Sequence, residues 1–525
     1  MRSLGEGLEK SLRLHREHVA IEYTPDSGPG SHALTYGGLD HWSADVCDAL
    51  RARGVGPGDR VALMLPNCPE YLVCAVAVAR LGAAKLPVNP VLAPATIRYM
   101  LELGDAKVLV VGPGLAEKAK AALDGLDIAV LQTVPGIDGA DPLPEAPAQN
   151  GPHRTIAAPV DPDLPAVVQF TGGTTGRPKG VLATQQGTRD FHLAQLIEGE
   201  IRRQERMLLM TPVSHAAGAF AETGLLRGAT ILLHESFDAG RTVHSLRHAG
   251  VTWTFLVPTM LYRILDALPP ELRDRAAGLA LDTVVYGAAP ISPRRLAEAL
   301  AVFGPVFVQL YGQSECPNWG TRLAKGDHDP ARPGLLASCG RASFFVDVRI
   351  VDDEGRDLPT GETGEICLRS PYLMHSYVKD PDATAAKFLA GPGGDRWIRT
   401  GDLGAMDGDG FVYLKDRKAD MVITGGMNVY SREVEDVLTK HPLVRAAAVI
   451  GVPHEDWGEA VQALVVAEDA VTGDELKAWC RERLSAYAVP KRFEFVGGFP
   501  ETPYGKIDKK ALRAAYWKDA DRAIN

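Results

Sequence analysis

A short stretch rich in glycine and threonine carries the clearest chemical signal in the sequence. It runs from Thr171 to Gly180 and includes Thr171, Gly172, Gly173, Thr174, Thr175 and Lys179. Glycine lets backbone N–H groups approach an anion, threonine hydroxyls donate hydrogen bonds, and a lysine adds positive charge. The spacing differs from that of a Walker A loop, which needs Gly-Lys-Ser/Thr after its glycines. These residue types predict a phosphate-binding loop.

The elements around this loop indicate an α/β fold. An apolar, strand-like run from Ala166 to Phe170 comes directly before the loop. Elsewhere helix-like periods alternate with short apolar runs, as in Leu39 to Arg53 followed by Arg60 to Leu65. Such alternation predicts parallel strands separated by helices, and ligands of such sheets gather at the carboxyl ends of the strands.

Length, charge and cysteine usage narrow the class of protein. The 525 residues are too many for one ordinary core, and the formal net charge of -10 gives no overall attraction to nucleic acid. Seven cysteines without a CxxC pair favour a reducing compartment over a disulfide framework. Residues 1–18 are polar where a signal peptide is apolar, and the longest apolar run is shorter than the roughly 20 residues of a membrane span. We therefore expect a cytoplasmic protein that acts on small molecules, with no nucleic acid and no membrane span.

The pattern of residue types changes after Gly340. Short strand-like runs with Gly and Asp turns follow, and then a smaller unit in which strands and helices again alternate. In this smaller unit Ser431 is expected to cap the helix Arg432 to Thr439. We expect two domains, residues 1–416 and residues 417–525.

Further motifs follow the loop in order along the chain. They are Gly287-Ala288-Ala289-Pro290, Tyr311-Gly312-Gln313-Ser314-Glu315, Thr400-Gly401-Asp402, Asp416-Arg417-Lys418-Ala419-Asp420 with Gly425-Gly426, and Thr502-Pro503-Tyr504-Gly505-Lys506. With the loop, this set resembles the signature of the adenylate-forming superfamily, which includes acyl- and aryl-CoA ligases, adenylation domains and luciferases. The resemblance covers the chain from about Thr35 to Leu512. It implies a large N-terminal domain of layered α/β subdomains with a small β-rich subdomain, and a small mobile α+β C-terminal domain.

The resemblance also implies a site for ATP and Mg²⁺. Glu315 would be the carboxylate associated with Mg²⁺, since hard oxygen donors suit that ion. Asp402 and Arg417 would hold the ribose through charge-assisted hydrogen bonds. The other residues implied to bind ATP, besides the loop, are Gly287, Ala288, Ala289, Pro290, Tyr311, Gly312 and Ser314.

By the same resemblance the catalytic residues are Lys506, His215 and Glu315. Lys506 would bridge the carboxylate substrate and the α-phosphate, where a fixed ammonium offsets the repulsion between two anions. His215 would flank the acyl pocket together with Phe220 and Gly312; an ordinary packed histidine is the alternative. The small apolar residues that follow His215 favour an apolar acid, either aryl or of medium chain length.

The acceptor of the acyl group is less sharply indicated. By the same resemblance, Gly425 and Gly426 would line the channel of the second substrate, and Ala419 would be the hinge. CoA is the expected co-substrate. Relatives usually carry Asp or Lys at the position of Ala419 and often proline at that of Ser431, and many CoA ligases carry lysine at that of Ala488. These departures leave open an amide bond synthetase, in which a free amine attacks the acyl-adenylate, and transfer to a carrier-protein thiol. A luciferase-like oxygenase and a nucleotide sensor are further alternatives, although a sensor would not need the catalytic lysine.

Overall fold

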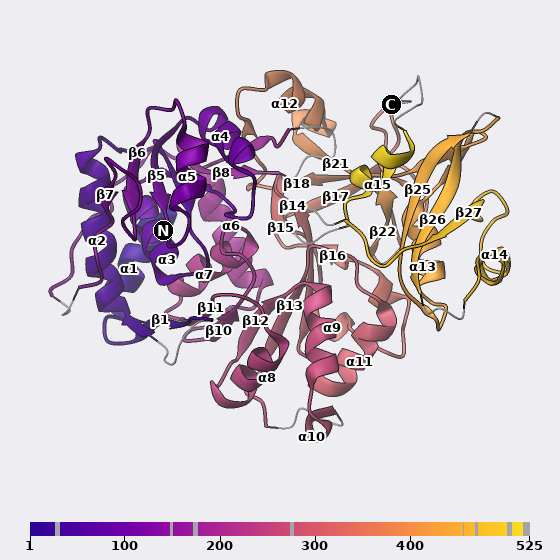
Figure 1. Cartoon of the computed structure of the whole chain (residues 1–525), viewed down its shortest axis with the longest axis horizontal. Helices are drawn as coiled ribbons and strands as arrows, with labels where there is room; N and C mark the ends of the chain where they lie inside the picture. Colours follow the sequence, from indigo (N-terminus) through magenta and orange to yellow (C-terminus); the bar gives the residue numbers. More distant parts are fainter. Residues whose placement is uncertain are drawn as a thin grey trace. The chain divides into compact units, whose positions relative to one another are not determined.

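The computed structural model describes residues 1–26, 32–147, 151–171, 177–273, 278–454, 456–467, 471–500 and 507–517 (Figure 1). The described residues form two compact units. Unit 1 lies within Met1–Thr171, Pro178–Val348 and Leu368–Ile398, and unit 2 within Gly172–Arg177, Arg349–Cys367 and Arg399–Asn525. Some predicted site residues lie outside the described residues, namely Gly172, Gly173, Thr174, Thr175, Lys506 and the motif residues Thr502 to Gly505.

A large sheet of unit 1 has the strand order β16-β15-β14-β13-β12-β10-β11-β1-β2. Strands β1, β11, β10, β12, β13 and β14 are mutually parallel where they pair, and β2, β15 and β16 add antiparallel edges. The bounds are β1 (Val19–Thr24), β2 (His32–Thr35), β10 (Arg206–Leu209), β11 (Thr230–His234), β12 (Trp253–Leu256), β13 (Thr283–Gly287), β14 (Phe307–Gln313), β15 (Cys316–Leu323) and β16 (Arg341–Ala342). The predicted parallel arrangement is confirmed here.

A second sheet of unit 1 has the order β19-β9-β8-β4-β3-β5-β6-β7. Its strands are parallel from β8 to β7, whereas β9 and β19 are antiparallel. The bounds are β3 (Arg60–Met64), β4 (Ala84–Pro87), β5 (Ala106–Val111), β6 (Ala129–Gln132), β7 (Asp141–Pro142), β8 (Pro165–Phe170), β9 (Gly180–Thr184) and β19 (Ser376–Tyr377). Since β8 ends at Phe170, the predicted phosphate loop begins at the carboxyl end of a parallel strand.

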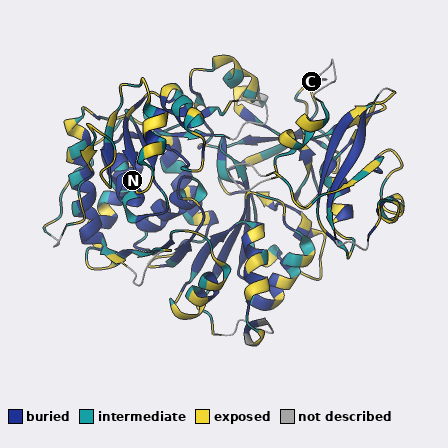
Figure 2. Ribbon diagram, in the orientation of Figure 1, coloured by how far each residue is buried: buried dark blue, intermediate teal, exposed yellow. Residues whose placement is uncertain are grey.

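Helices cover these sheets because their apolar faces need burial. Helix α3 (Pro69–Arg80) is apolar on nearly all sides, and it packs against α1, α2 and α7. Figure 2 shows buried strands beneath helices whose outer faces are exposed. The other helices of unit 1 are α1 (Leu4–Leu14), α2 (Tyr36–Ala52), α4 (Pro94–Leu103), α5 (Ala116–Leu123), α6 (Gln185–Glu198), α7 (Ala216–Leu226), α8 (Ala239–His248), α9 (Pro258–Ala267), α10 (Pro270–Arg273), α11 (Pro293–Phe303) and α12 (Pro381–Lys387). Within the described ranges, no helix combines the length and apolarity that a membrane span requires.

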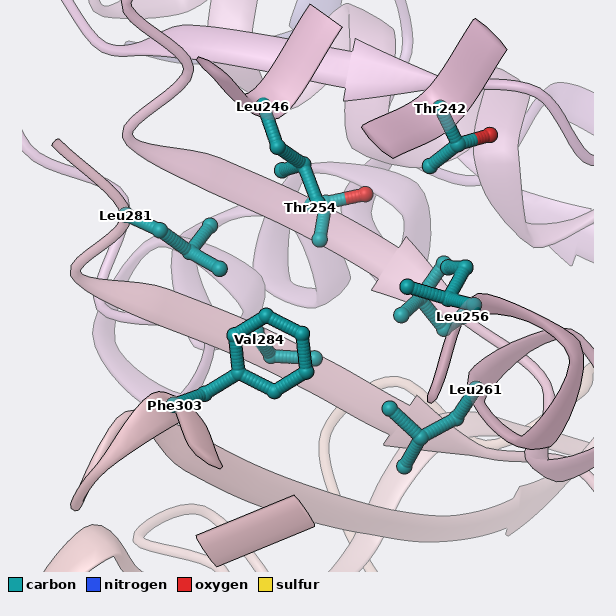
Figure 3. A pocket seen from close by; sticks show the side chains of 9 residues that line it. Thr242, Leu246, Thr254, Leu256, Leu261, Leu281, Val284 and Phe303 are labelled. Carbon is teal, nitrogen blue, oxygen red and sulfur yellow. The ribbon is translucent and has the colours of Figure 1, made fainter. Parts of the chain in front are cut away.

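A small cavity lies inside the core that β12 and β13 form with α8, α9 and α11 (Figure 3). Its volume is about 10 Å³ and its walls are mostly aliphatic or aromatic. The hydroxyls of Thr242 and Thr254, which also line it, donate to the carbonyls of Asp238 and Leu208. The cavity therefore has the character of a packing gap in the core.

Unit 2 contains β22, most of β18 and β21, and a second sheet of order β24-β23-β26-β25 with β27 paired to β26. The long strands β25 and β26 form an antiparallel pair from Val444↔Ala467 to His454↔Gly458. Their inner face packs on α13 and α14, and α15 contacts β25. The bounds of the strands not yet given are β17 (Asp347–Val351), β18 (Gly364–Arg369), β20 (Phe388–Ala390), β21 (Arg396–Met406), β22 (Val412–Arg417), β23 (Val422–Thr424), β24 (Met427–Val429), β25 (Val444–His454), β26 (Gly458–Ala467) and β27 (Arg492–Phe495). The helices are α13 (Ser431–Leu438), α14 (Gly473–Arg481) and α15 (Lys509–Tyr516).

The predicted capping role of Ser431 is wrong. Helix α13 begins at Ser431 itself, Tyr430 occupies the N-cap position, and the helix has no side-chain cap hydrogen bond. The Ser431 hydroxyl instead donates to Asp416 Oδ1 at 3.1 Å. A buried carboxylate therefore takes the hydroxyl away from the capping geometry.

Acid is expected to destabilise unit 1 through three buried histidines. Burial lowers the pKa of His192, His234 and His328 to about 4. Each imidazole takes up a proton near pH 6.5 when unfolded but only near pH 4 when folded, so the free energy of unfolding should fall as the pH drops between these values. The slope is about 1.4 kcal/mol per pH unit for each histidine. Urea unfolding of the His328→Gln variant should show a shallower fall than the wild type.

The exposed His375 provides the matched control, because His375→Gln should leave this pH dependence unchanged. Identical pH profiles for the wild type and His328→Gln would contradict the prediction.

Candidate active site

The motif Gly287 to Pro290 begins at the carboxyl end of β13. A β-carbon on Gly287 would lie 2.4 Å from the carbonyl oxygen of Leu310 on the neighbouring strand β14, so this close approach requires glycine. Ala288 then adopts a left-handed backbone conformation, with φ +64°, and is exposed. The chain thus leaves the sheet edge in a sharp turn, as expected of a loop that contacts a ligand.

The motif Tyr311 to Glu315 lies at the carboxyl end of the adjacent parallel strand. Strand β14 ends at Gln313 and β15 begins at Cys316, so Ser314 and Glu315 form the connecting turn. A β-carbon on Gly312 would lie 2.8 Å from backbone atoms of Cys316 and of Asn318. Because β13 and β14 are parallel neighbours, this motif and the Gly287 loop share one edge of the sheet.

Glu315 and Lys179 both contact Tyr377. The Glu315 carboxylate is buried, with 7% of the residue exposed, and it accepts a hydrogen bond from the Tyr377 hydroxyl. Burial and the nearby carboxylate raise the pKa of Tyr377 well above its usual value, so the phenol stays a donor. Lys179 Nζ lies 5.0 Å from the centre of the Tyr377 ring. One aromatic side chain therefore brings the lysine of the predicted phosphate loop close to the predicted Mg²⁺ ligand.

The strands explain this convergence. Lys179 precedes β9, whose Val181 pairs with Tyr377 of β19. The backbone N–H of Thr171 donates to the carbonyl of Lys179 at 3.0 Å, which closes the base of the predicted loop. Tyr377 also lines an open pocket of about 510 Å³, lined further by Ser376, Lys379, Asp380, Pro381, Thr384, Ala385, Phe388 and Arg396.

A single carboxylate at this point is compatible with Mg²⁺. The described residues contain no group of three or more His, Cys, Asp and Glu side chains that could hold a metal ion. Mg²⁺ often binds through one or two carboxylates and takes its other ligands from substrate phosphates and water. The donor set at Glu315 fits a metal that arrives with a nucleotide.

His215 immediately precedes α7, and Phe220 lies within this helix. His215 occupies the N-cap position, and its Nε2 lies 3.4 Å from Nδ2 of Asn89. Phe220 is fully buried, and its ring contacts those of Trp253 and Phe255 at centroid distances of 4.9 and 5.0 Å. Phe220 therefore lies in a tightly packed aromatic core, and its place in the acyl pocket stays a prediction.

In unit 2, Asp402 and Arg417 lie opposite each other on paired strands β21 and β22. Arg417 Nε is 3.4 Å from Asp402 Oδ1. The Asp402 side chain is only 14% exposed, whereas Arg417 is 51% exposed. The pair presents one carboxylate and one guanidinium, a combination suited to a polyhydroxyl group beside a phosphate.

The predicted second-substrate glycines form the turn between β23 and β24. Gly425 and Gly426 have φ values of +56° and +79°, a region that favours glycine. The Gly425 N–H donates to the carbonyl of Trp457 at 3.0 Å. Trp457 is 41% exposed, and its ring stacks on His454 at a centroid distance of 4.2 Å. Lys491 Nζ lies 5.1 Å from the centre of the Trp457 ring. An aromatic and cationic surface thus adjoins the glycine turn.

Two of the departures from related sequences have clear positions in unit 2. The carbonyl of Ala419 accepts a hydrogen bond from Arg513 at 3.3 Å. Ala488 is only 4% exposed and belongs to the hydrophobic core, so a lysine at this position would have to leave that core. The cation near the glycine turn is instead Lys491.

Two family models match the chain in sequence order. The model described as AMP-binding enzyme matches residues 8–378, and the AMP-binding enzyme C-terminal domain matches residues 433–506. The chain belongs to the AMP-binding enzyme family. The expected adenylate-forming ancestry is confirmed by this match.

Several characterised proteins resemble this AMP-binding enzyme over nearly its whole length. The medium/long-chain-fatty-acid–CoA ligase FadD8 of Mycobacterium tuberculosis is 39% identical, over 94% of this chain and 88% of the relative. A feruloyl-CoA synthase of Amycolatopsis sp is 38% identical, over 93% of this chain and 95% of the relative. The solved structure of the amide bond synthetase McbA from Marinactinospora thermotolerans is 34% identical, with a TM-score of 0.84, over 98% of this chain and 100% of that chain. The expected fold, with a large N-terminal and a smaller C-terminal α/β part, is confirmed by this similarity.

The AMP-binding enzyme also has site candidates that the motifs did not reveal. Tyr377 is one. A hydrogen-bonded chain of polar side chains is another: the half-buried Asn318 donates to the buried Gln195 at 2.6 Å, and Gln195 donates to the buried Thr223 of α7 at 2.7 Å. The neighbouring Glu222 pairs with Lys85, and both are buried. A glutamate within the apolar stretch of α7 was a usable signal, because a buried charge needs a partner.

Proposed function

We propose that this protein uses ATP to activate a carboxylic acid as an acyl-adenylate and then transfers the acyl group to the thiol of CoA. In the first step a carboxylate oxygen attacks the α-phosphorus, and the bond to the leaving pyrophosphate breaks. In the second step the CoA sulfur attacks the acyl carbon, AMP leaves, and the thiol proton passes to solvent. The observation that carries the first step is the convergence of Lys179 and Glu315 on Tyr377 at the sheet edge.

Residues of each unit would have separate roles in adenylation. The Gly287 to Pro290 loop and Tyr311 would bind adenine, Asp402 and Arg417 the ribose, and Lys179 the phosphates. Glu315 would hold Mg²⁺, which would supply positive charge where oxygens become more negative. Lys506 would bring an ammonium group to the reacting carboxylate and phosphate.

The surface beside the glycine turn supports CoA as the acceptor. A half-exposed tryptophan offers a flat face for an adenine ring, and Lys491 offers a cation for a phosphate. Glycine at 425 and 426 leaves space for a thin pantetheine chain. The amide bond synthetase reading remains the second candidate, because the similarity to McbA extends over the whole chain.

The small apolar residues that follow His215, from Ala216 to Ala219, support an apolar acid, aryl or of medium chain length. Named relatives that act on fatty acids and on ferulate support the same substrate class.

A product assay is expected to separate the two acceptors. The enzyme, ATP and Mg²⁺ are incubated with a panel of aryl and aliphatic acids, with either CoA or simple amines, and the products are identified by mass spectrometry. We expect acyl-CoA to form much faster than amide.

Trp457→Ala and Lys491→Ala should each raise the apparent KM for CoA about tenfold, since each removes a contact worth about 1 to 2 kcal/mol. Both variants should leave the rate of pyrophosphate release unchanged.

Arg483→Ala is the matched control for these variants. Arg483 also stacks on a tryptophan of unit 2, Trp479, with its guanidinium carbon 3.4 Å from the ring centre. It should leave the KM for CoA unchanged. Efficient amide formation with only adenylate and AMP in the presence of CoA would replace the CoA ligase proposal by the amide synthetase.

A further inference from the structure

Four side chains of unit 2 form a mostly buried polar cluster below the start of α15. Lys509, the first residue of α15, donates to the Ser431 hydroxyl at 2.7 Å and pairs with Glu435 Oε1 at 2.7 Å. The Ser431 hydroxyl in turn donates to Asp416 Oδ1 at 3.1 Å, and the Ser431 N–H donates to the other oxygen of Asp416. One hydroxyl therefore joins the ammonium of Lys509 to a carboxylate on β22.

The cluster is mostly buried and holds two carboxyl groups, Asp416 and Glu435, with one ammonium, that of Lys509. Ser431 is fully buried and Asp416 is 7% exposed, while the side chains of Lys509 and Glu435 are 16% and 18% exposed. Burial raises the pKa of Glu435 to about 7, although the Lys509 ammonium opposes this rise. Removing the Lys509 ammonium would leave two mostly buried carboxyl groups without this cation, so the contacts of Lys509 are strongly constrained.

A second contact ties the same helix to the predicted hinge segment. Arg513, one turn beyond Lys509, donates to Glu459 at 2.6 Å and to the carbonyl of Ala419 at 3.3 Å. Apolar residues of α15 complete the attachment, because Leu512 and Tyr516 pack against Ile450 and its neighbours. Helix α15 therefore contacts Ala419 through Arg513, and it is linked to Asp416 through Lys509 and the Ser431 hydroxyl.

The two elements joined in this way are each adjacent in the chain to a residue of the proposed adenylation site. Asp416 precedes Arg417, the proposed ribose ligand, and accepts the Arg417 N–H at 2.8 Å. Lys509 follows the proposed catalytic Lys506 by three residues in the chain. A proline, which is common in relatives at the position of Ser431, would have neither the hydroxyl nor the N–H that Asp416 accepts here.

We propose that Ser431 and Lys509 are positioning residues for adenylation, which hold the chain that follows Lys506 in register with the strand that carries Arg417. This inference rests on the proposed function, specifically on the role of Lys506. The side chains of the cluster act through the backbone and touch neither ATP nor the acid. Small misplacements of a catalytic group lower rates steeply, so the loss should appear in the step that uses Lys506.

Ser431→Ala tests the inference with little steric change. Acyl-adenylate formation is followed as pyrophosphate release in a single turnover, and acyl transfer to CoA is followed separately from supplied acyl-adenylate. Ser431→Ala should slow adenylate formation about tenfold and lower the thermal unfolding midpoint slightly, without changing the transfer rate. Lys509→Met should slow it further, and Lys509→Arg should recover most of the rate.

Lys510→Ala is the matched control, because Lys510 is the exposed neighbour of Lys509 on the same helix. It should behave as the wild type. Equal losses in both half-reactions, or an unchanged rate of adenylate formation in Ser431→Ala, would overturn the inference. Lys506→Ala distinguishes failure of the proposed function from failure of this inference. Normal adenylate formation in Lys506→Ala refutes the proposed role of Lys506. Slow adenylate formation in Lys506→Ala with a normal rate in Ser431→Ala refutes the positioning role alone.

Discussion

Lys506→Ala is expected to lower the rate of acyl-adenylate formation by about 100-fold or more, the largest effect of any single substitution in this chain. The reaction brings a carboxylate against a phosphate, and negative charge accumulates on oxygen as pyrophosphate leaves. Removing a fixed positive group from such a transition state costs about 3 to 4 kcal/mol, by analogy with the loss of an oxyanion-stabilising donor. Single-turnover pyrophosphate release, with saturating ATP and acid, measures this step directly.

Transfer from supplied acyl-adenylate to CoA should be largely intact in Lys506→Ala, because the phosphate chemistry has already taken place. Lys506→Arg keeps the charge but changes its shape, so it should recover only part of the adenylation rate. An equal loss in both half-reactions would contradict the assigned role, since it would indicate damage to the whole unit rather than to one step.

Glu315→Gln is expected to have the next largest effect, with a loss of about 100-fold in adenylation and a higher Mg²⁺ concentration for half-maximal rate. The amide keeps the size of the carboxylate and still accepts a hydrogen bond from the Tyr377 hydroxyl, so the fold should be preserved. It loses the negative charge that a hard divalent cation needs. Titration of the rate with Mg²⁺ at fixed ATP gives the shift.

Tyr377→Phe separates the charge of Glu315 from its orientation. This variant removes the hydroxyl that donates to Glu315 but keeps the ring that Lys179 faces. Tyr377→Phe should reduce the adenylation rate only several-fold, because the Glu315 carboxylate remains and is only less well oriented.

A Glu315→Gln variant with an unchanged Mg²⁺ dependence would show that Glu315 does not hold the metal.

Much of unit 1 followed from local sequence patterns. The apolar runs at Ala166 to Phe170 and Arg60 to Leu65 became β8 and β3 within one residue at each end. Glycines at 287 and 312 stand where a β-carbon would collide with backbone atoms, so their presence in the motifs has a direct steric cause. Periodicity and glycine placement are short-range properties, and a single sequence contains them.

The hydrogen-bond and ion-pair partners of the polar side chains did not follow from the sequence. The motifs named Glu315 and Lys179, but the sequence contained no sign that Tyr377, nearly two hundred residues beyond the predicted loop, would contact both. Ser431 had the type and position of an N-cap and became a bridge between Asp416 and Lys509 instead. Ala488 had the position of a CoA-binding lysine and is buried in the core.

Strand and helix positions and the order of the motifs along the chain were therefore determined by the sequence alone, because they depend on neighbouring residues. Which buried carboxylate receives which donor was decided by tertiary packing, because a desolvated charge takes the partner that the fold brings within reach, whatever their separation in the chain.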